Sequence, residues 1–264
     1  MLALKLGGVC VVIEPFSLPY SQEAVDDLRE RVRQTRWPDE APAGPWTQGF
    51  DRAALMDLCR YWADEFDWKA QVERLAAVPH FRFEAADGTG IHFIHVRGKG
   101  PAPMPLVLTH GWPGSFVEMM RIIPLLTDPA THGGDAADAF DLVVPSLPGY
   151  GFSDHPRESG MNAYRIAELW VELMQALGYE RFGAQGGDIG AGVSTALGLR
   201  HAEHLTGVHL NYIPGSYRPW LKDGEEPSAE EQESLTAVAK WYDENGAYGH
   251  HAGYASADGS VWIE

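Results

Sequence analysis

The stretch Gly186-Gly187-Asp188-Ile189-Gly190 decides how this chain is expected to fold. It follows a short apolar run at residues 181–185 and precedes an apolar run of helical length at 191–200, which predicts a sharp turn from strand to helix. Such a turn leaves no room for side chains beside its central residue, which accounts for the glycines. It also places Asp188 at a helix N-terminus, where the helix dipole favours an ionised carboxylate. The alternative is an aspartate that only caps a helix in a glycine-rich turn.

A second motif lies upstream, where HGWPG at residues 110–114 follows the apolar run at 106–109. In α/β-hydrolases this position holds the loop of the oxyanion hole, and the nucleophile turn reads G-x-nucleophile-x-G, with serine more usual than aspartate. The matching donors here are the backbone amides of Trp112 and Ile189. HGWPG alone fits a simple turn, but its place upstream of the nucleophile turn, with PGYG at 148–151 between them, favours the hydrolase fold.

The first third of the chain carries helical patterns. Ser21 is a suitable N-cap for a helix that Trp37-Pro38 ends, because proline disfavours helical dihedrals in the residue before it. Two more helices are expected at about 51–66 and 68–77. The helix at 51–66 is predicted to bury an apolar stripe, which consists of Leu55, Leu58, Tyr61 and Trp62.

Strand patterns begin at residues 80–84, and the turn Asp87-Gly88 joins them to 91–96 as a β-hairpin. Beyond it, short apolar strands alternate with helices, which predicts an α/β fold with a mostly parallel sheet covered on both faces. The expected strands are 106–109, 142–145, 181–185 and 205–211, and the expected helices are 164–177, 191–200 and an acidic one at 229–242.

The charge and the cysteine content of the chain argue against several classes of partner and site. The formal net charge of −17 over 264 residues argues against a nucleic-acid or anionic-membrane partner. Cys10 and Cys59 are too few for a disulfide framework or a zinc site, and they indicate reduced thiols in a cytoplasmic protein. The apolar residues 1–13 are shorter than the roughly 20 residues of a spanning helix, so we expect a floppy or strand-like extension. A membrane anchor is the less favoured alternative.

At these motifs the chain resembles the epoxide hydrolases, in the microsomal-type branch that carries an N-terminal epoxide hydrolase domain. The resemblance covers roughly residues 14–248. It implies an extension at 1–13, an N-terminal region of helices and a hairpin at 14–100, a partial hydrolase core at 101–213 and a partial lid at 214–264. The segments that carry the resemblance are Pro15-Phe16 with the helix to Trp37-Pro38, then 62–68, 110–115, 146–154 and 185–190.

The resemblance also implies a mechanism without metal or organic cofactor. Asp188 attacks a ring carbon of a small apolar epoxide and forms a covalent ester. Tyr248 matches a lid tyrosine that gives a proton to the developing alkoxide; alternatively it is an aromatic that only makes a lid contact. A water molecule activated by a histidine–carboxylate pair then hydrolyses the ester, while the amides of Trp112 and Ile189 hold the oxyanion.

The chain departs from the family pattern after the nucleophile. The family's base and its acid partner follow the lid, and only 76 residues follow Asp188 in this sequence. A second lid tyrosine is missing. We therefore expect a C-terminally shortened member of the family. If the protein itself stops at Glu264, we expect Asp188 to be alkylated at most once, because the ester could form but not be hydrolysed.

Histidines elsewhere do not fit the role of the base. His201, His204 and His209 follow the nucleophile turn directly and are expected to be surface or packing residues. His250 and His251 lie beside Tyr248, on the wrong element; a two-histidine metal site there lacks a third ligand. Two alternatives stay open: a haloalkane dehalogenase, which shares the aspartate nucleophile but lacks the helical N-terminal domain, and a truncated family member without catalysis.

Overall fold

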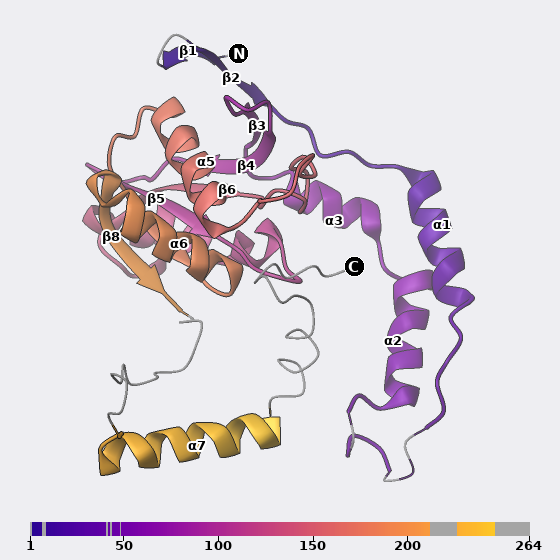
Figure 1. The fold of residues 1–264 in the computed structure, drawn as a ribbon. Helices are drawn as coiled ribbons and strands as arrows, with labels where there is room; N and C mark the ends of the chain where they lie inside the picture. Colours follow the sequence, from indigo (N-terminus) through magenta and orange to yellow (C-terminus); the bar gives the residue numbers. More distant parts are fainter. Residues whose placement is uncertain are drawn as a thin grey trace.

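A computed structural model describes residues 2–6, 9–40, 42, 44–47, 49–211 and 226–245. Its centre is an eight-stranded sheet in the order β1-β2-β3-β4-β6-β5-β7-β8, with helices on both faces (Figure 1). The α/β-hydrolase fold predicted from the sequence is confirmed. The strands are β1 Leu2–Leu6, β2 Val9–Pro15, β3 His80–Glu84, β4 Gly90–Val96, β5 Met104–Thr109, β6 Phe140–Pro145, β7 Phe182–Gly186 and β8 Leu205–Leu210.

Strand direction divides the sheet into two halves. Strands β6, β5, β7 and β8 run parallel, so their carboxyl ends meet at one edge. Strands β1 to β4 form an antiparallel meander that joins β6 through β4. The predicted hairpin is thus part of the same sheet, with Gly88 in its turn at φ +79°. The N-terminal residues take the strand-like alternative, because β2 pairs with β3.

Six of the helices were predicted from the sequence, and the short helix α4 was not. They are α1 Gln22–Arg33, α2 Arg52–Asp64, α3 Trp68–Leu75, α4 Ile123–Thr127, α5 Ala163–Ala176, α6 Ile189–Arg200 and α7 Ala229–Asn245. Short 3₁₀ turns are η1 Phe116–Arg121, η2 Pro129–His132, η3 Ala136–Asp138 and η4 Ala202–His204.

Helix α1 starts as predicted but ends early. The Ser21 hydroxyl accepts a hydrogen bond from the Ala24 amide at 3.2 Å, so Ser21 is the N-cap. The predicted end at Trp37-Pro38 is wrong, because the helix stops at Arg33. Both the amide and the hydroxyl of Thr35 donate to the Val32 carbonyl, and this local bonding competes with a further helical turn.

The core has one cluster on each face of the sheet. Because strand side chains alternate between faces, Val107 joins one cluster and Leu108 the other. Helices α5 and α6 cover the first face, where Trp170 is fully buried. Helix α4 and η1 cover the second, through Phe116 and Ile123.

The predicted buried stripe of α2 is wrong. Leu58, Tyr61 and Trp62 are 53%, 48% and 39% exposed, and Ala63 is the buried residue of this helix. The reason is the placement of α2, which packs on α1 and stands beside the sheet instead of on it (Figure 1). An apolar helix stripe predicts burial only where the helix lies against a core.

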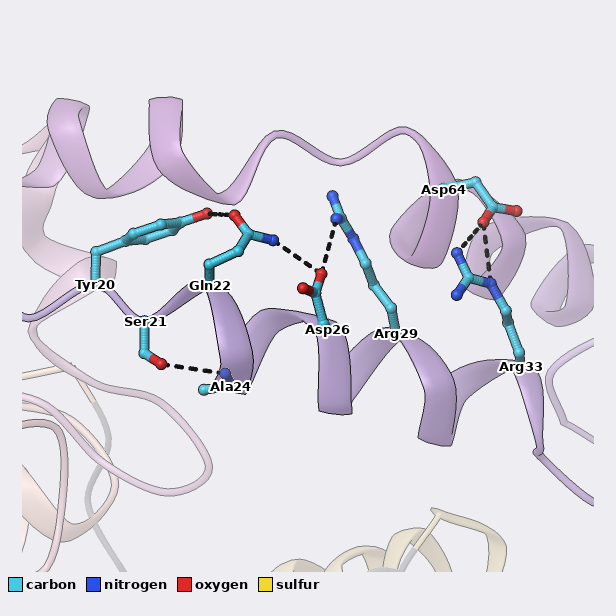
Figure 2. A network of polar contacts seen from close by, with 8 residues as sticks. All are labelled: Tyr20, Ser21, Gln22, Ala24, Asp26, Arg29, Arg33 and Asp64. Carbon is cyan, nitrogen blue, oxygen red and sulfur yellow. Dashed lines mark hydrogen bonds and ion pairs between the residues drawn. The ribbon is translucent and has the colours of Figure 1, made fainter.

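Exposed polar contacts occur within α1 and between α1 and α2. Figure 2 shows the Arg33 guanidinium donating to Oδ1 of Asp64 at 2.7 and 3.2 Å, which links the last turns of the two helices. At the start of α1, Gln22 donates to Asp26 at 2.8 Å. All of these groups are solvent-exposed, so each pair contributes little to stability.

Among the described residues, no helix is both long and apolar enough to cross a membrane.

Candidate active site

Asp188 lies at the tip of the predicted turn, between the end of β7 and the start of α6. Its backbone has φ +53° and ψ −123°, a conformation that non-glycine residues rarely adopt. The flanking glycines are required by backbone contacts. A Cβ on Gly186 would overlap the Gly190 carbonyl, and a Cβ on Gly190 would overlap the Thr109 carbonyl. The fold therefore holds Asp188 in a strained backbone conformation, at the edge of the sheet where the parallel strands end.

The loop after β5 reaches this carboxylate. The Trp112 amide donates a hydrogen bond of 2.8 Å to Oδ1 of Asp188. Gly111 makes the approach possible, because a Cβ there would overlap the Asp188 side chain. The base of the loop is fixed by the buried Trp170 indole, which donates to the Thr109 hydroxyl at 3.0 Å.

His110 supports the loop and has no free ring nitrogen. Its Nε2 accepts from the Leu147 amide at 3.1 Å, and its Nδ1 donates to the Gly111 carbonyl at 3.2 Å. Burial lowers the pKa of His110, opposed by the bond to Gly111, so the ring stays neutral. A neutral imidazole with both nitrogens bonded cannot take a proton from water, and His110 is therefore a positioning residue.

The segment 146–154 connects this loop to the N-terminal hairpin. Asp154 accepts from the Arg82 guanidinium at 2.7 Å and from the Gly90 amide at 2.9 Å. The hydrogen bond from Arg82 is the main cause that lowers the pKa of Asp154. Because Leu147 in the same segment donates to His110, the hairpin supports the loop of Trp112 indirectly.

A buried row of hydrogen bonds joins the same elements. His80 Nε2 donates to the Leu75 carbonyl at 2.9 Å, so Nδ1 of the neutral ring accepts from Nε2 of His92 at 2.9 Å. Nδ1 of His92 then accepts from the Ser146 hydroxyl at 2.9 Å. Burial, followed by the charges of His80 and Arg82, lowers the pKa of His92 to about 3. Sequence reasoning did not find this row.

A cavity of about 450 Å³ opens above Asp188. Its walls come from the carboxyl ends of β5, β7 and β8 and from η1, as expected where parallel strands end. The lining residues are Thr109, His110, Gly111, Trp112, Glu118, Met119, Gln185, Gly187, Asp188 and Asn211.

Sequence reasoning missed two carboxamides in this cavity. Gln185 Nε2 donates to Asn211 Oδ1 at 2.8 Å, between the ends of neighbouring strands β7 and β8. Gln185 precedes the nucleophile turn and Asn211 directly follows β8. Polar residues at the carboxyl ends of adjacent parallel strands were the signal that could have identified them.

The structure brings together two of the four residues predicted for the site. Asp188 and Trp112 are hydrogen-bonded, and Ile189 is the first residue of α6, where helix amides lack partners within the helix. Tyr248, like His250 and His251, lies outside the described residues.

The three histidines after the nucleophile turn do not line the cavity. His204 Nδ1 donates to the Glu180 carbonyl at 3.1 Å, away from Asp188. In the described part of the chain, no three His, Cys, Asp or Glu side chains gather as a metal site would require.

Two family models match the chain. The epoxide hydrolase N terminus matches residues 13–119, and the α/β hydrolase fold matches residues 104–246. A Stigmatella aurantiaca protein that bears an epoxide hydrolase name is 49% identical over 200 residues, which are 76% of this chain and 45% of that protein. Epoxide hydrolase 1 of Oryctolagus cuniculus is 42% identical over 203 residues, or 75% of this chain and 44% of that protein.

Solved structures are similar as well. The Aspergillus niger epoxide hydrolase superposes with a TM-score of 0.75 at 30% identity, over 94% of this chain and 64% of the other. This chain spans somewhat under half the length of the curated relatives that it matches.

Proposed function

Because this chain belongs to the epoxide hydrolases of the α/β-hydrolase family, we propose that it opens epoxides through a covalent ester on Asp188. The observation that carries the proposal is the 2.8 Å hydrogen bond from the Trp112 amide to Oδ1 of Asp188, on a strained strand-to-helix turn. It supports a carboxylate held in place as a nucleophile, beyond the role of a helix cap.

The hydrogen bond assigns different roles to the two carboxylate oxygens. Oδ1 is held by Trp112, so Oδ2 attacks the ring carbon while the ring C–O bond breaks and the epoxide oxygen takes a proton. Tyr248 is the proposed proton donor. In the resulting ester, Oδ1 is the carbonyl oxygen. When water attacks that ester, negative charge develops on Oδ1, where the amides of Trp112 and Ile189 stabilise it.

The hydrolytic step needs a general base. His110 is the histidine that the described residues contribute to the cavity, and both of its ring nitrogens are engaged. We therefore propose that Asp188, Trp112 and Ile189 perform ester formation and hold the oxyanion, and that no histidine among the described residues acts as the base.

Mass spectrometry tests the first step. The chain is incubated with styrene oxide, digested, and the peptide that contains Asp188 is weighed. We expect that peptide to gain the mass of one substrate molecule, and the Asp188→Asn variant to gain none. No adduct on a folded wild-type chain, or equal labelling of the variant, would overturn the proposal.

A second incubation, with a chloroalkane in place of the epoxide, distinguishes an epoxide hydrolase from a haloalkane dehalogenase. Chloride release from the chloroalkane without labelling by the epoxide would favour a haloalkane dehalogenase. The match to the epoxide hydrolase N terminus over residues 13–119 favours the epoxide reaction.

A further inference from the structure

Two carboxamides lie beside the nucleophile without a part in the chemistry proposed above. Gln185 and Asn211 line the same cavity as Asp188. Asn211 lies against the nucleophile turn, since a Cβ added to Gly187 would stand 2.8 Å from Asn211 Oδ1 and 2.9 Å from Nδ2. Because Gly187 immediately precedes Asp188, this amide lies beside the nucleophile turn.

The carboxamides of Gln185 and Asn211 have more hydrogen-bond donors and acceptors than their mutual bond uses. Two carboxamides offer four N–H donors and two acceptor oxygens. Their mutual bond at 2.8 Å uses one donor and one acceptor site. Within the described residues, neither side chain bonds to a further protein group. The mutual bond fixes the orientation of both amides, and their remaining donors and acceptors have no partner within the described residues.

The surroundings show which side of the cavity is polar. Ala184 lies in the core cluster under α5 and α6, so its neighbour Gln185 projects to the opposite face, toward η1. There η1 contributes the apolar Met119 side chain, next to the carboxylate residue Glu118. The cavity therefore holds the apolar Met119 side chain and a fixed amide pair, and an apolar substrate group placed on that pair would leave its donors unpaired.

We propose that Gln185 and Asn211 form a polar subsite that binds a hydroxyl or carbonyl group of the substrate close to the epoxide ring. The substrate class is thus an epoxide with a hydrogen-bonding substituent, which refines the expectation of a wholly apolar epoxide. This inference rests on the proposed function for its substrate, but the binding of the polar group does not require attack by Asp188.

The test uses two unreactive alcohols, butane-1,2,4-triol and pentane-1,2-diol, which differ only by a terminal hydroxyl in place of a terminal methyl group. Each is titrated into the ¹⁵N-labelled full chain, and the side-chain NH₂ signals of Gln185 and Asn211 are followed by NMR. We expect the triol to move both signals and to bind about fivefold more tightly than the diol, the usual effect of one neutral hydrogen bond.

Variants make the outcome decisive. Asn211→Leu and Gln185→Leu should bring the affinity ratio close to one while the diol affinity stays within about twofold. Thr206→Val, an exposed polar position on β8 outside the cavity, is the matched control and should keep the ratio. Equal wild-type affinities, or a ratio that survives in both leucine variants, would overturn the subsite.

A parallel experiment separates this inference from the proposed function. Asp188→Asn should retain the triol preference, because the carboxamide pair is unchanged. Labelling of wild-type Asp188 by 3,4-epoxybutan-1-ol and by 1,2-epoxypentane then tests the chemistry, with faster labelling by the hydroxy-epoxide expected. A triol preference without any labelling would refute ester formation and leave the subsite standing.

Discussion

The Trp112 amide and the Asp188 carboxylate, 76 residues apart in sequence, are joined by a hydrogen bond of 2.8 Å. The bond depends on the absence of a side chain at Gly111, because a Cβ there would overlap Asp188. Two loops from different strands therefore form one site, and small changes in either loop should affect the carboxylate before they affect the fold.

The Gly111→Ala substitution should slow labelling of Asp188 by about 100-fold, because misplacing a reacting group by about an ångström has an effect of that size. The control is Gly207→Ala in β8, where an added Cβ meets no atom within 4 Å. Labelling rates from timed mass spectrometry, with circular dichroism to confirm folding, check the prediction. Equal rates for both variants would contradict it.

Two glycines of helix α6 should respond in opposite directions. Gly190→Ala should destabilise the protein by about 3 kcal/mol or more, because the new Cβ would meet the backbone carbonyl of Thr109. Gly198→Ala should stabilise it by about 0.5–1 kcal/mol, because alanine favours the helix and its Cβ lies 3.6 Å from Val208. Urea unfolding measures both, and a similar loss in the two variants would refute the reason given.

The buried row of His80, His92 and Ser146 predicts a loss of stability in weak acid. His92 is neutral when folded, with its pKa lowered to about 3, whereas the unfolded chain takes up the proton near pH 6.5. The unfolded state therefore binds more protons below pH 6.5, and stability falls from there toward pH 3. Between pH 7 and pH 5, proton uptake by one such histidine in the unfolded state lowers the free energy of unfolding by about 2 kcal/mol.

Paired variants isolate this effect. His92→Gln should be less stable than the wild type at pH 7 and should lose about 2 kcal/mol less between pH 7 and pH 5. Ser146→Ala also removes a hydrogen bond of the row, but it leaves the titrating ring in place and should keep the wild-type slope. Urea unfolding at several pH values measures the slopes, and equal slopes for the wild type and His92→Gln would contradict the prediction.

Because the apolar stripe of α2 is exposed, we expect that shortening one of its side chains has little effect on stability. Leu58→Ala should change the free energy of unfolding by no more than about 0.5 kcal/mol, because Leu58 is 53% exposed. Leu169→Ala on α5 should cost about 2–5 kcal/mol, because that side chain is fully buried. Comparable losses in the two variants would mean that the stripe is covered in solution.

The sequence by itself determined the nucleophile turn and most strands and helices along the chain, though not the short helix α4. Strand and helix periods, the Ser21 cap and the glycines around Asp188 act through local sterics and hydrogen bonds, which neighbouring residues settle. The resemblance to epoxide hydrolases followed from the same local motifs. The proposed roles of Trp112 and Ile189 came from the position of their loops.

Only the tertiary structure decided which distant groups meet. The exposure of α2 depends on whether a core lies against it, and periodicity carries no information on that. The burial of His92 and the bond between Gln185 and Asn211 depend on strand order and register, which bring together residues far apart in the chain. Asp188 was identifiable from its neighbours, whereas its surroundings were fixed by packing between elements that no local pattern specifies.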